Sequence, residues 1–216
     1  MVKICNKPAY ILMCLLLSLA GGCSSSVNLQ VGGEKLPIPL ASQLPLALGV
    51  HYTDEFRNYV FEENSESRKE WKIDYQKPRL ALFAQILPTM FRSVEPVTEP
   101  KAAGAAATLD LILEPEVIET QVALPDETRS DNYEAWIKYG IKLYQPGGEL
   151  IAEWQLTGYG RSQTAMFTSK EQGINTAINL ALRDIGAKLV LDFQKAPGVR
   201  EWLAGKINCT EFQHLC

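Results

Sequence analysis

Few side chains in this sequence could carry out acid–base catalysis near neutral pH. The chain has 216 residues and two histidines, His51 and His214. Acid–base catalysis near pH 7 usually needs a histidine or a carboxylate with a strongly shifted pKa. His51 falls in a segment that predicts a strand, so we expect a structural, hydrogen-bonded histidine. The sequence contains no Gly-Xaa-Ser-Xaa-Gly elbow and no His-Glu-Xaa-Xaa-His pattern. We therefore expect a protein without catalytic residues.

Two other patterns could suggest a reaction, and each has a simpler interpretation. Glu114, Glu116 and Glu119 follow one another on a predicted strand, where Glu114 and Glu116 share a face. We interpret them as solvated side chains; a raised carboxylate pKa in a cleft would instead favour a cell-wall hydrolase. The segment 158–162 has two glycines but does not lead directly into a helix, so it predicts the end of a strand and not a phosphate loop.

The C-terminal cysteines are candidates for a disulfide. Cys209 and Cys216 are close in sequence, and in an oxidising compartment such a pair predicts a disulfide that closes a short loop. The entropic gain for so short a loop is ~2–3 kcal/mol. A metal site is the alternative, because His214 lies between the two thiols. Three candidate ligands at one chain end lack the paired spacing of zinc modules, so we expect neither a metal nor another cofactor.

The N-terminal residues have the pattern of an export signal. Lys3 and Lys7 precede an apolar run over 9–19, which is shorter than the roughly 20 residues that span a bilayer. The run ends in Leu19-Ala20-Gly21-Gly22-Cys23. This ending resembles the lipobox of bacterial lipoproteins. The resemblance implies that residues 1–22 are removed as a signal peptide and that Cys23 carries acyl chains such as diacylglyceryl and palmitate.

The lipobox resemblance also implies a location and a partner for the N-terminus. Two or more acyl chains hold a protein stably on a membrane. Ser24 follows the cysteine, which in enterobacteria-like sorting implies the inner leaflet of the outer membrane, with the body in the periplasm. Residues 23–43 are polar and contain Gly32-Gly33, which predicts a flexible tether. We expect a folded domain over 44–205 and a tail over 206–216.

Charge and length limit the remaining possibilities. The chain has 21 basic and 25 acidic residues. Removing residues 1–22 takes away two lysines and no acids, which leaves 19 against 25 and a net charge of −6. An acidic body is not expected to bind nucleic acid. The mature length predicts one domain.

Alternating apolar residues predict the strands. They cover 46–52, 108–117 with an extension to 121, and 133–144, followed by a hairpin turn at 145–149 and a return strand to 158. In 133–144, Lys138 and Lys142 lie opposite the apolar face, which consists of Ile137, Tyr139, Ile141 and Leu143. The return strand is expected to bury Leu150, Ala152, Trp154, Leu156 and Gly158. Residues 62–70 predict a loop, and residues 71–75 predict a short extended segment. The aromatic residues around Phe56 predict that the chain continues along the edge of the sheet after the first strand.

Two helices complete the predicted fold. The first starts at Pro78 and is interrupted at Pro88, with an apolar face of Leu80, Phe83, Ala84, Leu87 and Phe91. The second is capped by Thr168 or Ser169 and has an apolar stripe of Ile174, Ala177, Ile178, Ala181, Leu182, Ile185, Leu189 and Phe193. Pro197-Gly198 ends it before a short helical turn. The sequence thus predicts an α+β two-layer sandwich: a mostly antiparallel sheet of about four strands with two helices on one face.

The order of these elements resembles the YajG-type family of enterobacterial outer-membrane lipoproteins. The resemblance spans Leu109 to Leu203, through the strand Asn132–Tyr144, the stretch Trp154–Tyr159 and the helical part from Ile174 to Trp202. It implies a lipoprotein without established chemistry and transfers no functional residues. The stretch from Glu62 to Tyr75 and the cysteine-bearing tail depart from the family pattern.

Two classes of binding function remain open beside the hydrolase. The first is an envelope assembly or interaction factor that contacts an acidic or glycan-bearing protein partner through outward-facing Trp136, Lys138 and Lys142, or through strand addition at a sheet edge. The same lysines could simply protect a solvent face from aggregation. The second class handles lipid or lipopolysaccharide in a cleft between helix and sheet; its lining would be Phe83, Phe91, Trp154 and Phe193, which could equally form the core.

Overall fold

A computed structural model describes residues 25–33, 42–66, 68–99, 108–166 and 169–206. The predictions for Cys23, for the disulfide between Cys209 and Cys216 and for His214 therefore lie outside the described residues. The described part has two sheets, one of five strands in the order β5-β2-β6-β7-β8 and one of three in the order β1-β4-β3. The α+β class is confirmed, whereas the predicted number of about four strands is too low.

The five-stranded sheet is mixed. Its long strands β6 (Leu111–Ala123), β7 (Asn132–Tyr144) and β8 (Leu150–Gln163) are antiparallel neighbours. Strand β2 (Leu44–His51) is parallel to both β6 and β5 (Phe91–Val97). Parallel neighbours need a long crossover, and residues 52–90 provide it between β2 and β5. Strand β5 was not predicted, because Arg92, Glu95 and Pro96 interrupt any apolar alternation; its edge position tolerates the proline.

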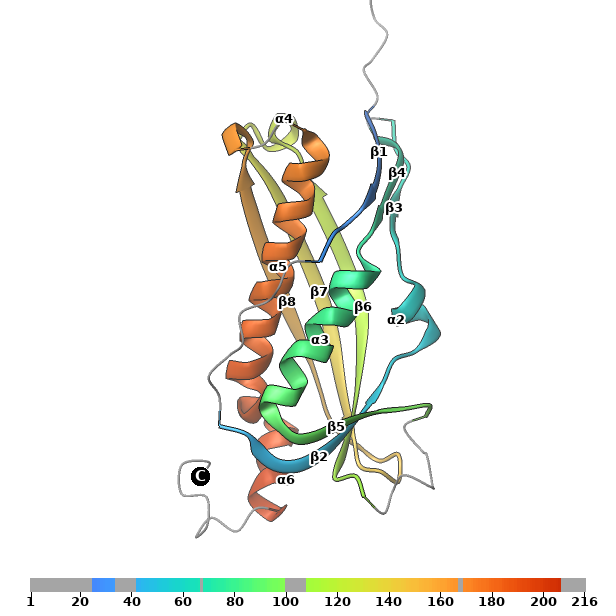
Figure 1. Cartoon of the computed structure of the whole chain (residues 1–216), viewed down its shortest axis with the longest axis vertical. Coiled ribbons are helices and arrows are strands. Elements are labelled where there is room, and N and C mark those ends of the chain that lie inside the picture. The colour runs from blue at the N-terminus through green and yellow to red at the C-terminus, as the bar shows by residue number, and fades with distance from the viewer. Residues whose placement is uncertain (1–24, 34–41, 67, 100–107, 167–168, 207–216) are drawn as a thin grey trace, which may run out of the picture.

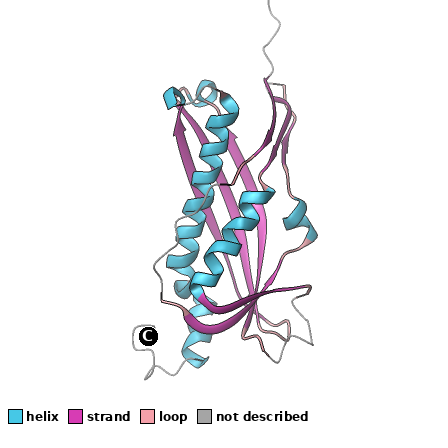
Figure 2. Ribbon diagram, in the orientation of Figure 1, coloured by secondary structure: helices cyan, strands magenta, loops and turns pink. Residues whose placement is uncertain are grey.

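Two helices pack on the same face of this sheet, as predicted. They are α3 (Gln76–Met90) and α5 (Lys170–Asp192), and Figures 1 and 2 show both in front of β6, β7 and β8. Three shorter helices and two 3-10 turns are also described: α2 (Asp54–Asn58), α4 (Pro125–Thr128), α6 (Pro197–Lys206), η1 (Thr164–Met166) and η2 (Phe193–Lys195). Thus α2 replaces the predicted edge strand around Phe56, and α4 lies in the predicted loop before β7.

Helix α5 agrees closely with its sequence pattern. Ser169 is the N-cap, and its side chain accepts a hydrogen bond from the Gln172 backbone N–H at 3.3 Å. All eight residues of the predicted apolar stripe are buried. The agreement arises because α5 packs mainly on β7 and β8 and therefore buries one side. A 3.6-residue period in the sequence is enough to identify that side.

The buried face of α3 differs from the prediction. Leu82 and Ile86 are buried beside Phe83 and Leu87, whereas Leu80 is half-buried and Ala84 is exposed. The helix also continues two residues beyond Pro88. Because α3 contacts α2, α5 and β5, its buried face is broader than one stripe and is centred on residues that the sequence pattern did not select.

The small sheet corrects two further predictions. Strands β3 (Phe61–Glu63) and β4 (Arg68–Asp74) form an antiparallel pair where residues 62–70 predicted a loop, and β1 (Ser25–Gln30) runs parallel to β4. The prediction of a flexible tether over 23–43 is therefore wrong for residues 25–33. The reason is burial: Val27 and Val31 are 2% and 3% exposed. Their alternation with Leu29 was the signal in the sequence.

Two glycines lie in the middle of β8 and do not end it. Strand β8 continues to Gln163, five residues past the predicted end. A Cβ atom on Gly158 or Gly160 would overlap the backbone of α5 at Ala181 or Ala177. These glycines therefore allow α5 to lie directly on β8.

At the other end of the strand, Leu150 is 49% exposed and does not join the predicted inner face.

A buried arginine connects α3 with the end of α2 and the residue that follows this helix. Arg79 is fully buried, and its Nη2 atom donates hydrogen bonds to the carbonyl oxygens of Tyr59 at 3.1 Å and Arg57 at 3.3 Å. Its guanidinium lies 4.9 Å from the ring centroid of Tyr75 and also faces Phe56 and Tyr59. Aromatic faces attract a desolvated cation, so carbonyls and rings stabilise this charge inside the core.

Candidate functional site

The outer face of β6, β7 and β8 carries an aromatic pair. Trp136 on β7 lies opposite Tyr159 on β8, and their ring centroids are 5.2 Å apart at an interplanar angle of 37°. Trp136 is half-buried and Tyr159 is 39% exposed. Beside the pair lies a cavity of about 170 Å³. We call this surface the sheet-face patch; it consists of Glu119, Gln121, Trp136, Lys138, Thr157 and Tyr159.

The two lysines predicted to bind a partner lie on this face, but each is paired with a glutamate. Lys138 Nζ lies 3.1 Å from a Glu119 carboxylate oxygen, and Lys142 Nζ lies 2.8 Å from one of Glu116. The hydrogen bond from Lys138 lowers the pKa of Glu119. The hydrogen bond to Glu116 raises the pKa of Lys142. Trp136 and Lys138 are thus brought together in the patch, whereas Lys142 lies further along β7.

The outer face is acidic overall, which corrects the expectation of a basic surface. Its described charged side chains include more carboxylates than cations; they are Glu114, Glu116, Glu119, Glu134, Glu153, Lys138, Lys142 and Arg161. Sequence analysis selected the lysines from β7 alone. It could not assign the glutamates opposite to them, because the register of β6 against β7 changes at a bulge between Val117 and Glu119.

The exposed edge of β8 is closed where the patch reaches it. The Tyr159 backbone N–H donates to the Asp184 carboxylate at 3.0 Å, and Lys188 Nζ donates to the Thr157 carbonyl oxygen at 2.6 Å. Asp184 and Lys188 also form an ion pair across one turn of α5, at 2.8 Å. Strand addition needs free backbone groups. A partner is therefore excluded from pairing with β8 at this point, and binding through the face is favoured over binding through the edge.

His51 is hydrogen-bonded, as the sequence predicted. Its Nδ1 atom lies 2.7 Å from Glu114 Oε2, and the Tyr144 hydroxyl donates to Glu114 Oε1 at 3.5 Å. Burial, followed by the neighbouring Glu114 carboxylate, raises the pKa of Tyr144. The Glu114 side chain is 14% exposed, so the interpretation of Glu114 as solvated is wrong.

Within the described residues, no group of three His, Cys, Asp or Glu side chains could hold a metal ion.

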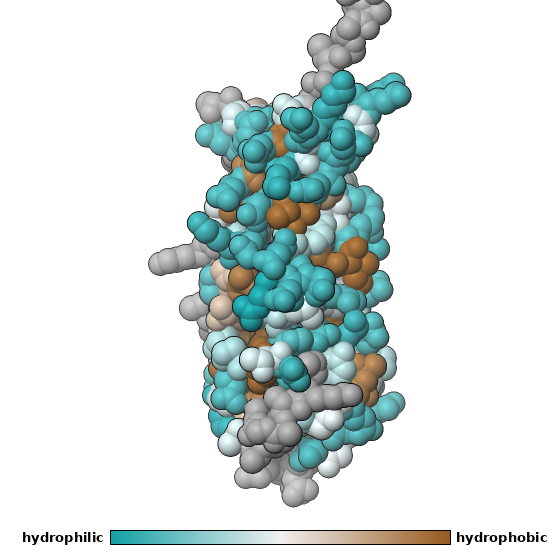
Figure 3. Space-filling view, turned by 90° about the vertical axis from the view of Figure 1, so that its right-hand side faces the viewer, coloured by the Kyte–Doolittle hydropathy of each residue, from teal (hydrophilic) through white to brown (hydrophobic). Residues whose placement is uncertain are grey.

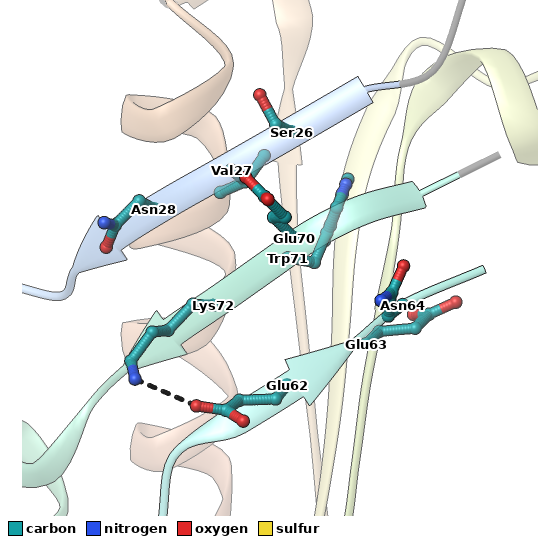
Figure 4. Close-up of a pocket in the computed structure, with 9 residues that line it drawn as sticks. All are labelled: Ser26, Val27, Asn28, Glu62, Glu63, Asn64, Glu70, Trp71 and Lys72. Carbon is teal, nitrogen blue, oxygen red and sulfur yellow. Dashed lines mark ion pairs between the residues drawn. The ribbon is translucent and has the colours of Figure 1, made fainter. Parts of the chain in front are cut away.

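A larger cavity of about 520 Å³ lies on the small sheet (Figure 4). Its lining is Ser26, Val27, Asn28, Glu62, Glu63, Asn64, Glu70, Trp71 and Lys72. Glu62 lies 2.9 Å from Lys72 Nζ, and Glu63 lies 2.7 Å from Arg68 Nη1. Two of the three lining carboxylates are therefore neutralised by nearby cations. Figure 3 shows this side of the molecule to be mostly hydrophilic, with separate small apolar areas.

Arg68 attaches this small sheet to the end of the large one. It donates to Glu127 of α4 and, at 2.7 Å, to the Val122 carbonyl oxygen of β6, and its guanidinium lies 4.4 Å from a Trp71 ring centroid. Burial opposes ionisation of Glu127, but hydrogen bonds from Arg68 and the Leu124 backbone N–H dominate and lower its pKa. The sequence pattern contained no signal for this contact.

The four aromatic residues proposed to line a lipid cleft pack into the interior: Phe91 and Trp154 each contact Phe193, and Phe83 contacts Phe56 and Tyr139. Phe83, Phe91 and Phe193 are at most 1% exposed, and the ring centroids of Phe91 and Phe193 are 5.2 Å apart. Trp154 is half-buried with its ring centroid 6.0 Å from that of Phe193. These side chains form part of the core, which was the alternative interpretation of the same pattern.

Comparison with known proteins places the fold among solved structures. No family model matches the sequence, and no curated protein matches it. A neuraminyllactose-binding hemagglutinin homolog from Helicobacter pylori is similar in structure, with a TM-score of 0.50 and 13% identity over 82% of this chain and 100% of that one. A DUF330-family protein from Xanthomonas campestris has a TM-score of 0.48 and 13% identity, over 80% of this chain and 98% of that one. A minor lipoprotein from Acinetobacter baumannii has a TM-score of 0.41 and 9% identity, over 71% of this chain and 94% of that one.

At 13% identity, the likeness to the Helicobacter pylori protein concerns the fold alone and leaves the chemistry of the sites to this chain's own residues. The YajG-type resemblance stays a prediction, since no family model matches. Among the helices of the described residues, none is long and apolar enough to cross a membrane.

Proposed function

We propose that this protein is a lipid-anchored envelope lipoprotein without enzymatic activity that binds an envelope protein partner through the sheet-face patch. The anchor is supported by the lipobox that ends at Cys23 and by the YajG-type pattern over 109–203. We further propose the periplasmic side of the outer membrane as its location, from Ser24 after the acylated cysteine.

The aromatic pair is the observation that supports the binding surface. Tyr159 and Trp136 lie side by side on a sheet face, where a partner can bury both rings at once. Aromatic side chains are the residues that most often dominate binding energy at protein interfaces. The surrounding ion pairs between lysines and glutamates leave an excess of carboxylates. A partner surface with apolar and neutral or basic residues would therefore match this patch better than an acidic one.

Photocrosslinking in living cells tests this proposal. A benzoyl-phenylalanine is placed at Thr157, inside the patch, and in a matched control at Leu191, an exposed apolar position on α5. The expected result is one abundant protein adduct from position 157 that is absent from position 191 and is lost when Trp136→Ala is added. Identical adducts from both positions would contradict the proposal, and so would recovery of lipid or glycan alone.

A further inference from the structure

The segment that joins the proposed lipid anchor to the folded body is very short. Only Ser24 separates Cys23 from Ser25, the first residue of β1. Because consecutive Cα atoms lie ~3.8 Å apart, the Cα atoms of Cys23 and Ser25 are separated by at most ~8 Å. Acyl chains on Cys23 inside a bilayer would therefore hold the beginning of β1 at the membrane surface.

Strand β1 is firmly attached to the small sheet. Its residues Val27 to Gln30 pair in register with Trp71 to Asp74 of β4, and the Val31 backbone N–H donates to the Asp74 carbonyl oxygen at 2.8 Å. Val27 and Val31 are both buried. Exposing these buried valines to water is unfavourable, so β1 does not detach readily to lengthen the connection.

The chain after β1 is also bound to α5. The Gly32 backbone N–H donates to Asn175 Oδ1 at 2.8 Å, and Asn179 Nδ2 donates to the Gly32 carbonyl oxygen at 2.8 Å. Asn179 is 2% exposed. Both backbone groups of one residue are thus held by two asparagines one helical turn apart. The proposed anchor is therefore connected through β1 to α5, the longest helix of the described residues.

One end of the molecule is defined by the beginning of β1. Figure 1 shows that α4, η1 and the first turns of α5 lie at the same end, and that the β7–β8 turn lies at the opposite end. At the near end, Met166 in η1 is 72% exposed, more than any other large apolar side chain of the described residues. Helix α5 has 23 residues, and at ~1.5 Å per residue it separates the two ends by roughly 35 Å.

We infer that the end formed by β1, α4 and η1 lies against the lipid headgroups of the membrane that holds the Cys23 acyl chains, with Met166 in contact with the bilayer interface. This inference rests on the proposed lipid anchor. An exposed thioether on a projecting turn has the apolar character that suits insertion at the headgroup–acyl boundary. The body then projects into the periplasm with the β7–β8 turn at its far end, and the sheet-face patch opens to the side.

Fluorescence quenching measures the distance of each end from the bilayer. The lipidated protein with Cys209→Ser and Cys216→Ser is labelled at Met166→Cys or, as the matched control, at Gly147→Cys, where nothing lies within 4 Å of an added Cβ. It is bound to vesicles of phosphatidylethanolamine and phosphatidylglycerol that contain a quencher-bearing lipid. Quenching at position 166 is expected to exceed that at position 147 by about fivefold or more. Equal quenching at both positions would overturn the inference.

Lengthening the connection tests its cause. Ten glycine and serine residues inserted between Ser24 and Ser25 should reduce the quenching at position 166 to about that of the control, because the body can then move away from the membrane surface. Unchanged quenching would show that the short connection does not set the position of the body, and would contradict the argument.

The unmodified sequence offers a second measurement. After removal of residues 1–22 the chain has two methionines, exposed Met166 and buried Met90. Oxidation of Met166 by hydrogen peroxide should be about threefold slower on vesicles than in the Cys23→Ala protein, with Met90 as the internal reference. Equal rates would contradict the inference. If the wild-type chain does not bind vesicles, the proposed anchor itself has failed; if it binds without protecting Met166, only the orientation is wrong.

Discussion

At the scale of single residues, the backbone of Glu70 is under local strain. Its φ angle of 57° lies in the left-handed region, within β4 and beside the irregular pairing with β1. That region costs a residue with a Cβ atom about 1–2 kcal/mol, whereas glycine adopts it freely. Glu70→Gly should therefore raise the free energy of unfolding by about 0.5–1 kcal/mol, since part of the gain is offset by the flexibility of glycine in the unfolded chain.

The control for this variant is Glu70→Gln, which removes the charge and keeps the Cβ atom. Chemical denaturation of both variants separates the two effects. If Glu70→Gln stabilises the protein as much as Glu70→Gly, repulsion among the carboxylates of the small sheet is responsible and the strain argument is wrong.

The pairing of Lys138 with Glu119 has a measurable consequence for titration. Lys138→Ala should raise the pKa of Glu119 toward its ordinary value of 4.5, because the hydrogen bond from Lys138 is the largest of the causes that lower this pKa, ahead of the hydrogen bond from Gln121. A carboxylate with a lowered pKa in the folded state favours folding above its unfolded pKa, and this contribution disappears as the pH falls through the folded pKa. NMR titration of the Glu119 side chain measures the shift. The control is Lys142→Ala, which disrupts the pair with Glu116 and should leave the pKa of Glu119 unchanged.

At the scale of elements, the contact between β8 and α5 depends on the two mid-strand glycines. Gly160→Ala should lower the free energy of unfolding by about 2–3 kcal/mol, because the added methyl group overlaps the α5 backbone at Ala177. Gly147→Ala lies in open space and should change stability by less than about 0.5 kcal/mol. Thermal and urea unfolding of the two variants provide the comparison. Equal effects would mean that α5 does not approach β8 this closely.

The closed edge of β8 makes a separate prediction. Asp184→Ala with Lys188→Ala removes the side chains that occupy the Tyr159 N–H and the Thr157 carbonyl. Free edge groups promote pairing between copies of a chain. The double variant should therefore form dimers and larger aggregates at concentrations where the wild type is monodisperse, as sedimentation velocity would detect. The control is Arg183→Ala, which removes an exposed charge from α5, keeps both contacts to β8 and should have no such effect.

The accuracy of the sequence predictions varied with the environment of each element. The pattern of α5 and the apolar face of β7 were confirmed, because each element has one buried side and its period alone identifies that side. The predicted buried face was wrong for α3, which packs against several elements. Strand β3 has only three residues and is too short to show a period, and at β1 the alternation of Val27, Leu29 and Val31 was outweighed by the polar and glycine residues around it. Arg68 and Arg79 were missed for a different reason: their partners lie on distant segments, and no local pattern encodes those contacts.

At the scale of the whole molecule, the attachment of β1 to α5 would decide how the body moves relative to the proposed anchor at Cys23. Asn179→Ala removes a buried donor to the Gly32 carbonyl and should lower the free energy of unfolding by about 1–3 kcal/mol. Hydrogen exchange should show faster opening of β1 and β4 in this variant, with β7 unchanged. If exchange in β1 is already fast in the wild type, β1 is not firmly attached and the short connection to Cys23 loses its significance.

The central claim is that Cys23 becomes the acylated first residue of the mature protein. Intact-mass and N-terminal peptide mass spectrometry of the membrane-extracted protein tests it most directly, with Cys23→Ala as the control. The account predicts a chain that begins at Cys23 and carries the mass of its acyl groups, and a Cys23→Ala protein that no longer partitions with membranes. A chain that retains residues 1–22, or that carries no lipid while still sedimenting with membranes, would contradict it.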